Sequence, residues 1–235
     1  MAQQALTTQA AIRGRLALGL GLSHKPVVES RWGMSFDRPA QYMHEYVTIL
    51  QPLLRGEQVD FQGERVKGQG QLNVPDAPAP PVLLAALGPR MLRIAGTLSD
   101  GTITWMVGPK TLEMHVTPVI TQAAQEAGKT SPRIVVGLPI CVTDDVAAAR
   151  ARAARGLERY GQLPSYRAML DLEGAAGPAD VAIVGSEQNV ERQLQHLEAL
   201  GATDFEASVF GSPDEQQRTL AVLRAAVSHG RPAAV

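Results

Sequence analysis

The stretch that decides the fold is Val82–Trp105, with the sequence VLLAALGPRMLRIAGTLSDGTITW. It opens with an apolar β-run that ends at a Gly-Pro break. An amphipathic helix follows, and an Asp-Gly turn leads into a second β-run. This order predicts a complete strand–helix–strand unit with short connections. Because parallel α/β sheets bind ligands at the carboxyl ends of their strands, the residues that matter for binding are Ala86–Arg90 and Trp105–Lys110.

Strands alternate with helices on both sides of this stretch, which predicts a parallel sheet with right-handed crossovers. The five expected core strands are Arg15–Gly21, Val82–Ala86, Thr102–Met106, Arg133–Val142 and Asp204–Phe210. Amphipathic helices are expected at Ala2–Arg13, Arg38–Arg55, Pro89–Leu98, Pro109–Ala127, Asp144–Tyr160, Gly185–Leu200 and Pro213–Ser228. Turn residues within Val59–Val74 predict a β-hairpin insertion, and Gln162–Ala182 reads as irregular with one short helix at Ser165–Leu172. No break in composition marks a second domain, so residues 1–235 are expected to form one, with a frayed tail at Arg231–Val235.

Composition narrows the classes of function. The chain has 235 residues, 45% of them hydrophobic, and 22 basic residues balance 23 acidic ones. Scattered basic residues argue against nucleic-acid binding, and no apolar run approaches the ~20 residues that span a membrane. The sole cysteine, Cys141, lies in an apolar run, which predicts a buried structural thiol and a cytoplasmic protein. No spacing of His, Cys or carboxylates is typical of a metal site, so none is expected.

Four segments resemble one family in order along the chain. They are LTTQAAIRGRLALGLGLSH, FDRPAQYMHEYVTILQPLLRGEQVDFQGERV, PPVLLAALGPRMLRIAGTLSDGTITW and VGSEQNVERQLQHLEALGATDFEASV. Together they resemble the luciferase-like monooxygenases, and among them the coenzyme F420-dependent oxidoreductases. The resemblance implies an eight-stranded TIM (β/α) barrel that here lacks its first three strands. On this reading, we expect Met1 to be an internal methionine of a longer reading frame.

The loop Ala86-Leu87-Gly88-Pro89-Arg90 leaves a strand and enters a helix. Exposed N–H groups and the helix dipole favour an anion there, Gly88 permits close backbone approach, and Arg90 can neutralise a phosphate. The resemblance implies that this loop holds the cofactor phosphate. Gly108-Pro109-Lys110 follows the next strand and repeats this pattern, with Lys110 as the charge. The alternatives are an ordinary turn for the first loop and a capped helix with a solvated lysine for the second.

Three further residues are candidates for contact with the cofactor. Trp105 ends a strand and can stack on a ring system, although a core position is the competing interpretation. Ser23 and His24 follow the LGLG strand, and the resemblance implies that their loop approaches the ring of a flavin or deazaflavin. His24 can donate a hydrogen bond or act as an acid or base. No residue is singled out as catalytic.

The resemblance implies an oxidoreductase that transfers a hydride between coenzyme F420 and a small organic substrate, in which the protein supplies positioning and excludes water. FMN is the alternative cofactor, since both molecules carry a ring and a phosphate. A reading of a different class is an inactive fragment or an interaction module, because an open parallel sheet exposes an apolar edge. The expected partners are a small-molecule substrate and a second copy in a homodimer.

Overall fold

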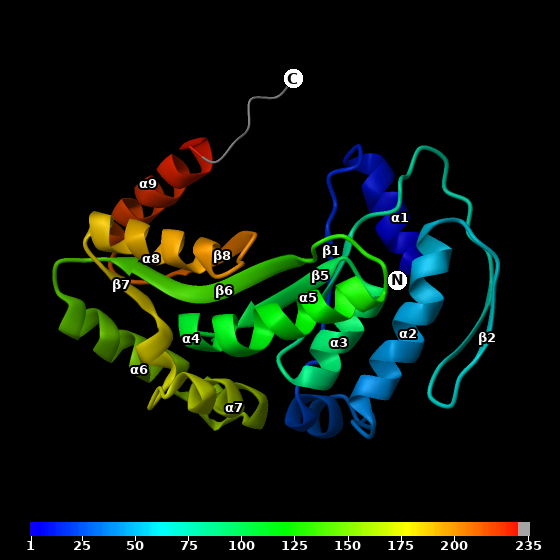
Figure 1. Ribbon diagram of the computed structural model, residues 1–235, viewed down its shortest axis with the longest axis horizontal. Coiled ribbons are helices and arrows are strands. Elements are labelled where there is room, and N and C mark those ends of the chain that lie inside the picture. Colours follow the sequence, from blue (N-terminus) through cyan, green and yellow to red (C-terminus); the bar gives the residue numbers. More distant parts are fainter. Residues whose placement is uncertain (230–235) are drawn as a thin grey trace. The chain divides into compact units, whose positions relative to one another are not determined.

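The computed structural model describes residues 1–229 and divides into two compact units (Figure 1). The first unit comprises Met1–Ile103 and Val119–Arg133, and the second comprises Thr104–Pro118 and the residues from Ile134 onward. The tail expected at 231–235 lies outside the described residues. Within residues 1–229, no helix combines the length and the apolar character that crossing a membrane requires.

The first unit carries the amino-terminal elements. The chain runs through helix α1 (Ala2–Ala11), strand β1 (Leu18–Leu20), the π-helical turn η1 (Val27–Arg31) and helix α2 (Pro39–Leu54). It continues through strands β2 (Val59–Gln62), β3 (Lys67–Gly70) and β4 (Val82–Ala85), helix α3 (Pro89–Leu98) and strand β5 (Gly101–Trp105). Most of helix α5 (Thr117–Glu126) belongs to this unit too, whereas the last two residues of β5 do not.

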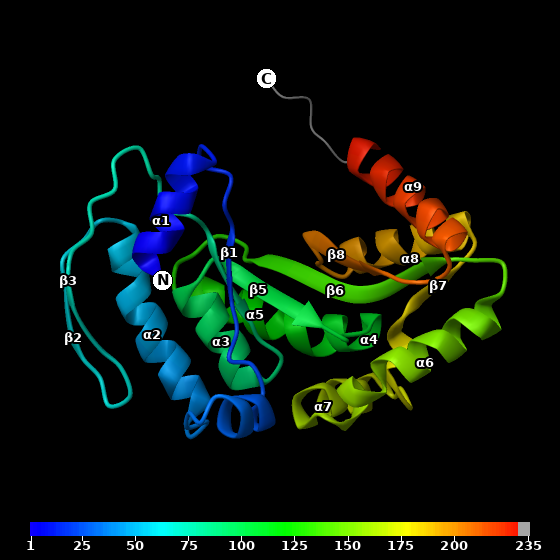
Figure 2. The same cartoon turned by 180° about the vertical axis from the view of Figure 1, so that it is seen from behind.

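Parallel pairing sets the register of the first unit. Leu18–Leu20 of β1 lie opposite Val82–Leu84 of β4, and Leu83–Ala85 of β4 lie opposite Gly101–Ile103 of β5. Val82 and Leu84 are fully buried, as expected for a strand covered by helices. Helices α1 and α2 lie side by side in both views (Figures 1 and 2).

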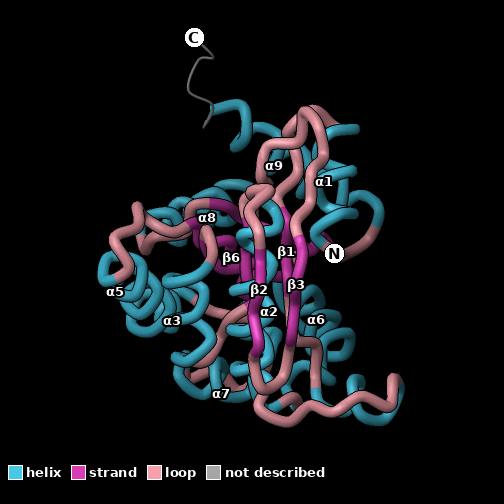
Figure 3. The backbone as a smooth tube through the Cα atoms, turned by 90° about the vertical axis from the view of Figure 1, so that its right-hand side faces the viewer, coloured by secondary structure: helices cyan, strands magenta, loops and turns pink. Residues whose placement is uncertain are grey.

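The predicted hairpin is present, with β2 and β3 antiparallel and running side by side in Figure 3. A buried carboxylate ties its turn to helix α2. The Glu45 carboxylate accepts hydrogen bonds from the backbone N–H groups of Glu64 at 3.2 Å, Arg65 at 2.7 Å and Val66 at 2.8 Å. Helix α2 therefore fixes the position of the Arg65 backbone, from which the side chain extends.

The second unit carries the remaining elements. After β5 come helix α4 (Pro109–Thr111), the π-helical turn η2 (Leu112–Val116), strand β6 (Arg133–Val142), and helices α6 (Val146–Gln162) and α7 (Pro164–Glu173). A 3-10 turn η3 (Pro178–Val181), strand β7 (Ile183–Gly185), helix α8 (Glu187–Ala199), strand β8 (Asp204–Val209) and helix α9 (Pro213–His229) complete it. Strand β6 pairs in parallel with both β7 and β8, and α8 lies beside α9 (Figure 2).

The expected α/β architecture of parallel strands with a hairpin is confirmed, with one correction. Six strands outside the hairpin lie within residues 1–229, not five, because β7 was missed. Its three residues are all buried, but a three-residue strand inside a Gly- and Ala-rich stretch is too short to show a periodic pattern. Cys141 is a free thiol with no exposed surface, as predicted, and burial raises its pKa.

Candidate functional site

The loop that follows β1 holds Ser23 and His24 in a turn that starts a helical segment. Ser23 is exposed and has a φ of 59°, a left-handed conformation that is uncommon for serine. The carbonyl of His24 accepts hydrogen bonds from the N–H groups of Val27 at 2.9 Å and Val28 at 3.0 Å. His24 is half-buried, so its ring is partly covered while Ser23 faces outward.

The loop that follows β4 ends in the amino terminus of helix α3. Ala86 is buried, Leu87 and Gly88 are half-buried, and Pro89 and Arg90 are exposed. Gly88 is the N-cap and has no side chain with which to bond the first amides of the helix. A Cβ atom built on Gly88 would meet nothing within 4 Å, so the space beside this N-cap residue is open. An open helix terminus beside an arginine suits an anion.

Strand pairing brings these two loops to one edge of the sheet. Leu20 lies opposite Leu84, so the chain leaves β1 and β4 in the same direction and at the same level. A Cβ atom built on Gly21 would lie 3.2 Å from that of Ala85, which shows how closely the backbones approach. The structure therefore places Ser23 and His24 at the same carboxyl edge as Ala86–Arg90.

In the second unit, a carboxylate already occupies the amides that follow Gly108. Glu173, the last residue of α7, accepts hydrogen bonds from the N–H groups of Lys110 at 3.2 Å and Thr111 at 2.7 Å. Gly108 is buried, and a Cβ atom there would overlap the Glu173 carboxylate. Lys110 is exposed. A phosphate can use these amides only after Glu173 has left them.

Trp105 ends β5 and packs against an aromatic cluster of the second unit. Its ring meets Tyr160 edge-on with centroids 5.9 Å apart, and Tyr160 meets Tyr166 in the same manner at 5.4 Å. Burial, with a smaller contribution from Tyr160, raises the pKa of Tyr166, so its phenol stays neutral. The indole nitrogen of Trp105 is buried and has no hydrogen-bond partner, which leaves a donor available to a ligand.

Two features of these loops were missed from the sequence. Met106, fully buried directly after Trp105, has a φ of 60°, a strained conformation for a residue with a side chain. Nothing in the sequence marks methionine for that conformation. Glu173 is 62 residues away from Thr111 along the chain, so no local motif could reveal their contact.

The chain is similar in sequence to a family of known enzymes. Residues 1–229 match the family model described as luciferase-like monooxygenase. The chain is 27% identical over 230 residues to 5,10-methylenetetrahydromethanopterin reductase of Methanolobus tindarius. The alignment covers 85% of this chain and 68% of that reductase. It spans about half the length of two other curated relatives, 52% of one and 48% of the other.

Two solved structures share the fold. The coenzyme F420-dependent tetrahydromethanopterin reductase from Methanopyrus kandleri matches with a TM-score of 0.71 and 21% identity, over 98% of this chain and 78% of that one. The FMN complex of the oxygenating constituent of 3,6-diketocamphane monooxygenase from Pseudomonas putida matches with a TM-score of 0.68 and 17% identity, over 94% of this chain and 73% of that one. These likenesses confirm the expected fold, in a chain shorter than both enzymes. With the match of the family model to residues 1–229, they show that this chain belongs to the luciferase-like monooxygenase family.

Proposed function

We propose that this chain binds coenzyme F420 through the amino terminus of helix α3. In this proposal the chain catalyses hydride transfer between the cofactor and a small organic substrate. Membership of the family and the F420-dependent reductase among the solved relatives support the choice of cofactor. The observation that carries the proposal is the open terminus of α3, where Gly88 leaves space and Arg90 supplies a charge.

The chain's own residues have distinct tasks in this proposal. The first amides of α3 hold the cofactor phosphate, and Arg90 neutralises it with a charge-assisted hydrogen bond. His24 lies at the same edge of the sheet, where it would contact the ring of the cofactor. When bound, the deazaflavin supplies the hydride chemistry, while the protein binds, orients and excludes water.

A titration of the full chain with F420, followed by the fluorescence of the cofactor, tests this proposal. Arg90→Gln should weaken F420 binding by about tenfold, since a charge-assisted hydrogen bond is worth roughly 1.5 kcal/mol or more. The matched control is Arg155→Gln, which removes an exposed arginine of α6 in the second unit and should leave the affinity unchanged.

FMN, titrated in parallel, separates the two cofactors. Saturable binding of F420 but not of FMN supports the deazaflavin. Binding of FMN alone would replace F420 with FMN in the proposal. If neither cofactor binds, or if Arg90→Gln and Arg155→Gln bind F420 equally well, the proposal is wrong.

A further inference from the structure

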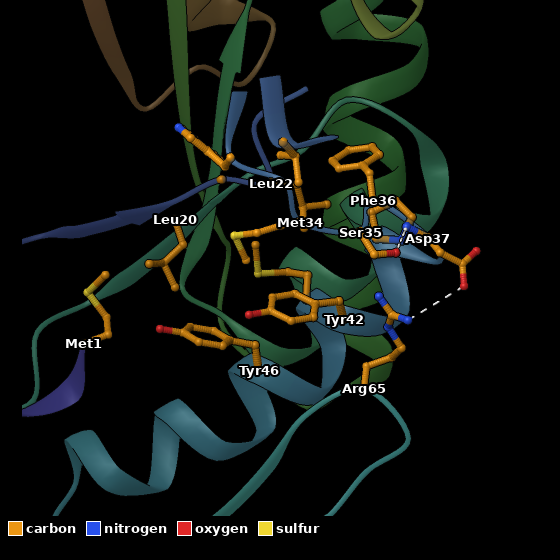
Figure 4. A pocket seen from close by; sticks show the side chains of 15 residues that line it. Met1, Leu20, Leu22, Met34, Ser35, Phe36, Asp37, Tyr42, Tyr46 and Arg65 are labelled. Carbon is orange, nitrogen blue, oxygen red and sulfur yellow. Dashed lines mark hydrogen bonds and ion pairs between the residues drawn. The ribbon is translucent and has the colours of Figure 1, made fainter. Parts of the chain in front are cut away.

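A pocket of about 270 Å³ opens in the first unit, beside the carboxyl end of β1 (Figure 4). Strand β1 and the residues after it, the loop that follows η1, the inner face of helix α2 and the hairpin turn all contribute. Its lining is largely apolar and aromatic, and includes Leu20, Leu22, Met34, Tyr42, Tyr46 and Arg65. The volume lies just below the range of ~300–1,000 Å³ that is usual for small-molecule sites, so it suits a ligand of one or two rings.

Two tyrosines of α2 form one wall of the pocket. The rings of Tyr42 and Tyr46 are stacked with centroids 6.0 Å apart and an interplanar angle of 17°. Figure 4 shows both rings on the side of the pocket opposite Leu22 and Met34. Burial raises the pKa of Tyr46, so its phenol stays uncharged at neutral pH. Such a surface favours another flat, apolar group.

The rim of the pocket exposes large apolar side chains to water. Trp32 is 55% exposed, Met34 is 57% exposed and Met1 is 57% exposed, and all three line this pocket. Methionine is flexible and polarisable, so it adapts its contact to ligands of different outline. A bound ligand would remove apolar surface of each of these side chains from water, which favours binding by roughly 25 cal/mol per Å².

Arg65 supplies the one cationic side chain of the lining, and not all of its N–H donors have a hydrogen-bond partner. Its Nε atom is buried and has no hydrogen-bond partner. Its Nη1 atom forms a 3.8 Å ion pair with Asp37, which also lines the pocket and whose side chain is 66% exposed, so an anionic ligand would compete with Asp37 for the guanidinium. The bond from the Arg65 amide to Glu45 holds the backbone in place at 2.7 Å. The guanidinium is therefore a positioned donor at the edge of an aromatic pocket.

We propose that this pocket binds a flat, largely apolar small molecule that carries one anionic group. The rings of the ligand lie against Tyr42 and Tyr46, and the anion accepts hydrogen bonds from Arg65. A purely apolar ligand would leave the buried Nε atom without a partner, whereas an anionic oxygen would satisfy it. The pocket adjoins the loop of Ser23 and His24 but uses none of the residues Ala86–Arg90, so the tests of this site and of the proposed phosphate site can fail separately.

Two fluorescent probes that differ in charge test the proposal on the full chain. Aminonaphthalene sulfonate is flat and anionic, and naphthylamine has the same two rings without the sulfonate. In a Trp105→Phe background, Trp32 is the only tryptophan and reports each probe by energy transfer. Both probes should bind, and Arg65→Gln should weaken the sulfonate about tenfold while leaving the neutral probe unchanged. Arg65→Lys keeps the charge without the planar donor, so its affinity for the sulfonate should fall between those of the wild type and Arg65→Gln.

Three controls make the outcome decisive. Lys67→Gln removes an exposed cation of the same hairpin and should change neither affinity. Tyr46→Ala should weaken both probes, whereas Leu172→Gln, which removes an exposed apolar residue of the second unit, should weaken neither. Equal binding of the sulfonate to wild type and Arg65→Gln, at unchanged thermal stability, would overturn the proposal. So would loss of probe binding as the chain dimerises in sedimentation, since a second copy would then be the occupant.

Discussion

Gly108 and Gly88 hold the same place in their helices, yet the structure gives them different neighbours. Both are N-cap residues in extended backbone that any residue can adopt. A Cβ on Gly88 would meet open space, whereas one on Gly108 would overlap the carboxylate of Glu173. The requirement for glycine at position 108 therefore comes from contact with α7, not from backbone conformation.

This difference predicts the cost of adding a methyl group at each position. Gly108→Ala should destabilise the chain by about 1–2 kcal/mol, because the flexible Glu173 side chain would have to leave the two amides that it bonds, and Gly88→Ala should be close to neutral. Glu173→Ala should lose two hydrogen bonds but relieve the clash, so the double variant should cost less than the sum of the two single variants. Denaturant unfolding of the wild type and the four variants measures these costs. Strict additivity of Gly108→Ala and Glu173→Ala in their double variant would contradict the contact.

At the scale of single residues, sequence analysis found candidate sites where the signal was local. Gly88 and Arg90 stand out because a strand, a glycine, a proline and a helix follow one another directly. Glu173 and the strained Met106 could not be found in this way. The first acts across 62 residues, and the second has a backbone conformation that its residue type does not predict.

At the scale of elements, Glu45 connects helix α2 to the hairpin. Burial alone would raise the pKa of Glu45, but bonds from the amides of Arg65 and Val66, with weaker help from Gln41 and Glu64, lower it below its usual value. The stabilising effect of this carboxylate is therefore present above the pKa that it has in the unfolded chain. It is lost as the pH falls below about 4.5, the ordinary value.

Glu45→Gln should lower the thermal midpoint by a few degrees, because the amide NH2 of glutamine faces backbone donors that the carboxylate now satisfies. Amide hydrogen exchange should accelerate most at the hairpin turn. Asp60→Asn, on the exposed side of β2, is the matched control and should change neither quantity. An unaltered exchange rate at Arg65 and Val66 in Glu45→Gln would contradict this role.

Most elements could be predicted because their apolar periodicity is strong. Helix α3 and strand β6 have the expected bounds, and Ser186 caps α8 as its sequence predicts. Strand β1 is shorter than Arg15–Gly21, since only Leu18–Leu20 pair with β4. The turn η3 fell inside the stretch read as irregular, and strand β7 lies directly after that stretch, between it and the helix predicted from Gly185. Such short segments gain their structure from tertiary contacts rather than from periodicity.

At the scale of the whole molecule, acid should destabilise the second unit through two carboxylates. Bonds from Thr143 and the Ser212 amide, together with Arg152, lower the pKa of Glu215 to about 2. The ion pair with Arg218 lowers that of Glu187 to about 2. Since both folded values lie below the ordinary value of 4.5, their stabilisation is complete above that pH and is lost towards pH 2.

The thermal midpoint should therefore fall steadily as the pH is lowered from about 4.5 towards 2. Glu215→Gln removes one of these titrations, so its midpoint should start lower and change less over the same range. Glu191→Gln, an exposed position on α8, should keep the slope of the wild type. Parallel curves for Glu215→Gln and the wild type in calorimetry would show that this carboxylate does not contribute.

The alternation of strands and helices was enough to predict the fold class, because each amphipathic element has to bury one face against the next. The chain shares that fold with enzymes of which it spans 73–78% of the length. The proposed cofactor function depends on one place in this fold, the amino terminus of α3.

Amide NMR of the labelled full chain, titrated with F420, tests that claim most directly. The amide signals of Arg90 and Met91 should shift as F420 is added and should saturate with the affinity measured by fluorescence. In Arg90→Gln, the amide signals of residues 90 and 91 should need about tenfold more F420 to shift by the same fraction. Binding of F420 that moves other amides and leaves those of Arg90 and Met91 unchanged in the wild type would contradict the account.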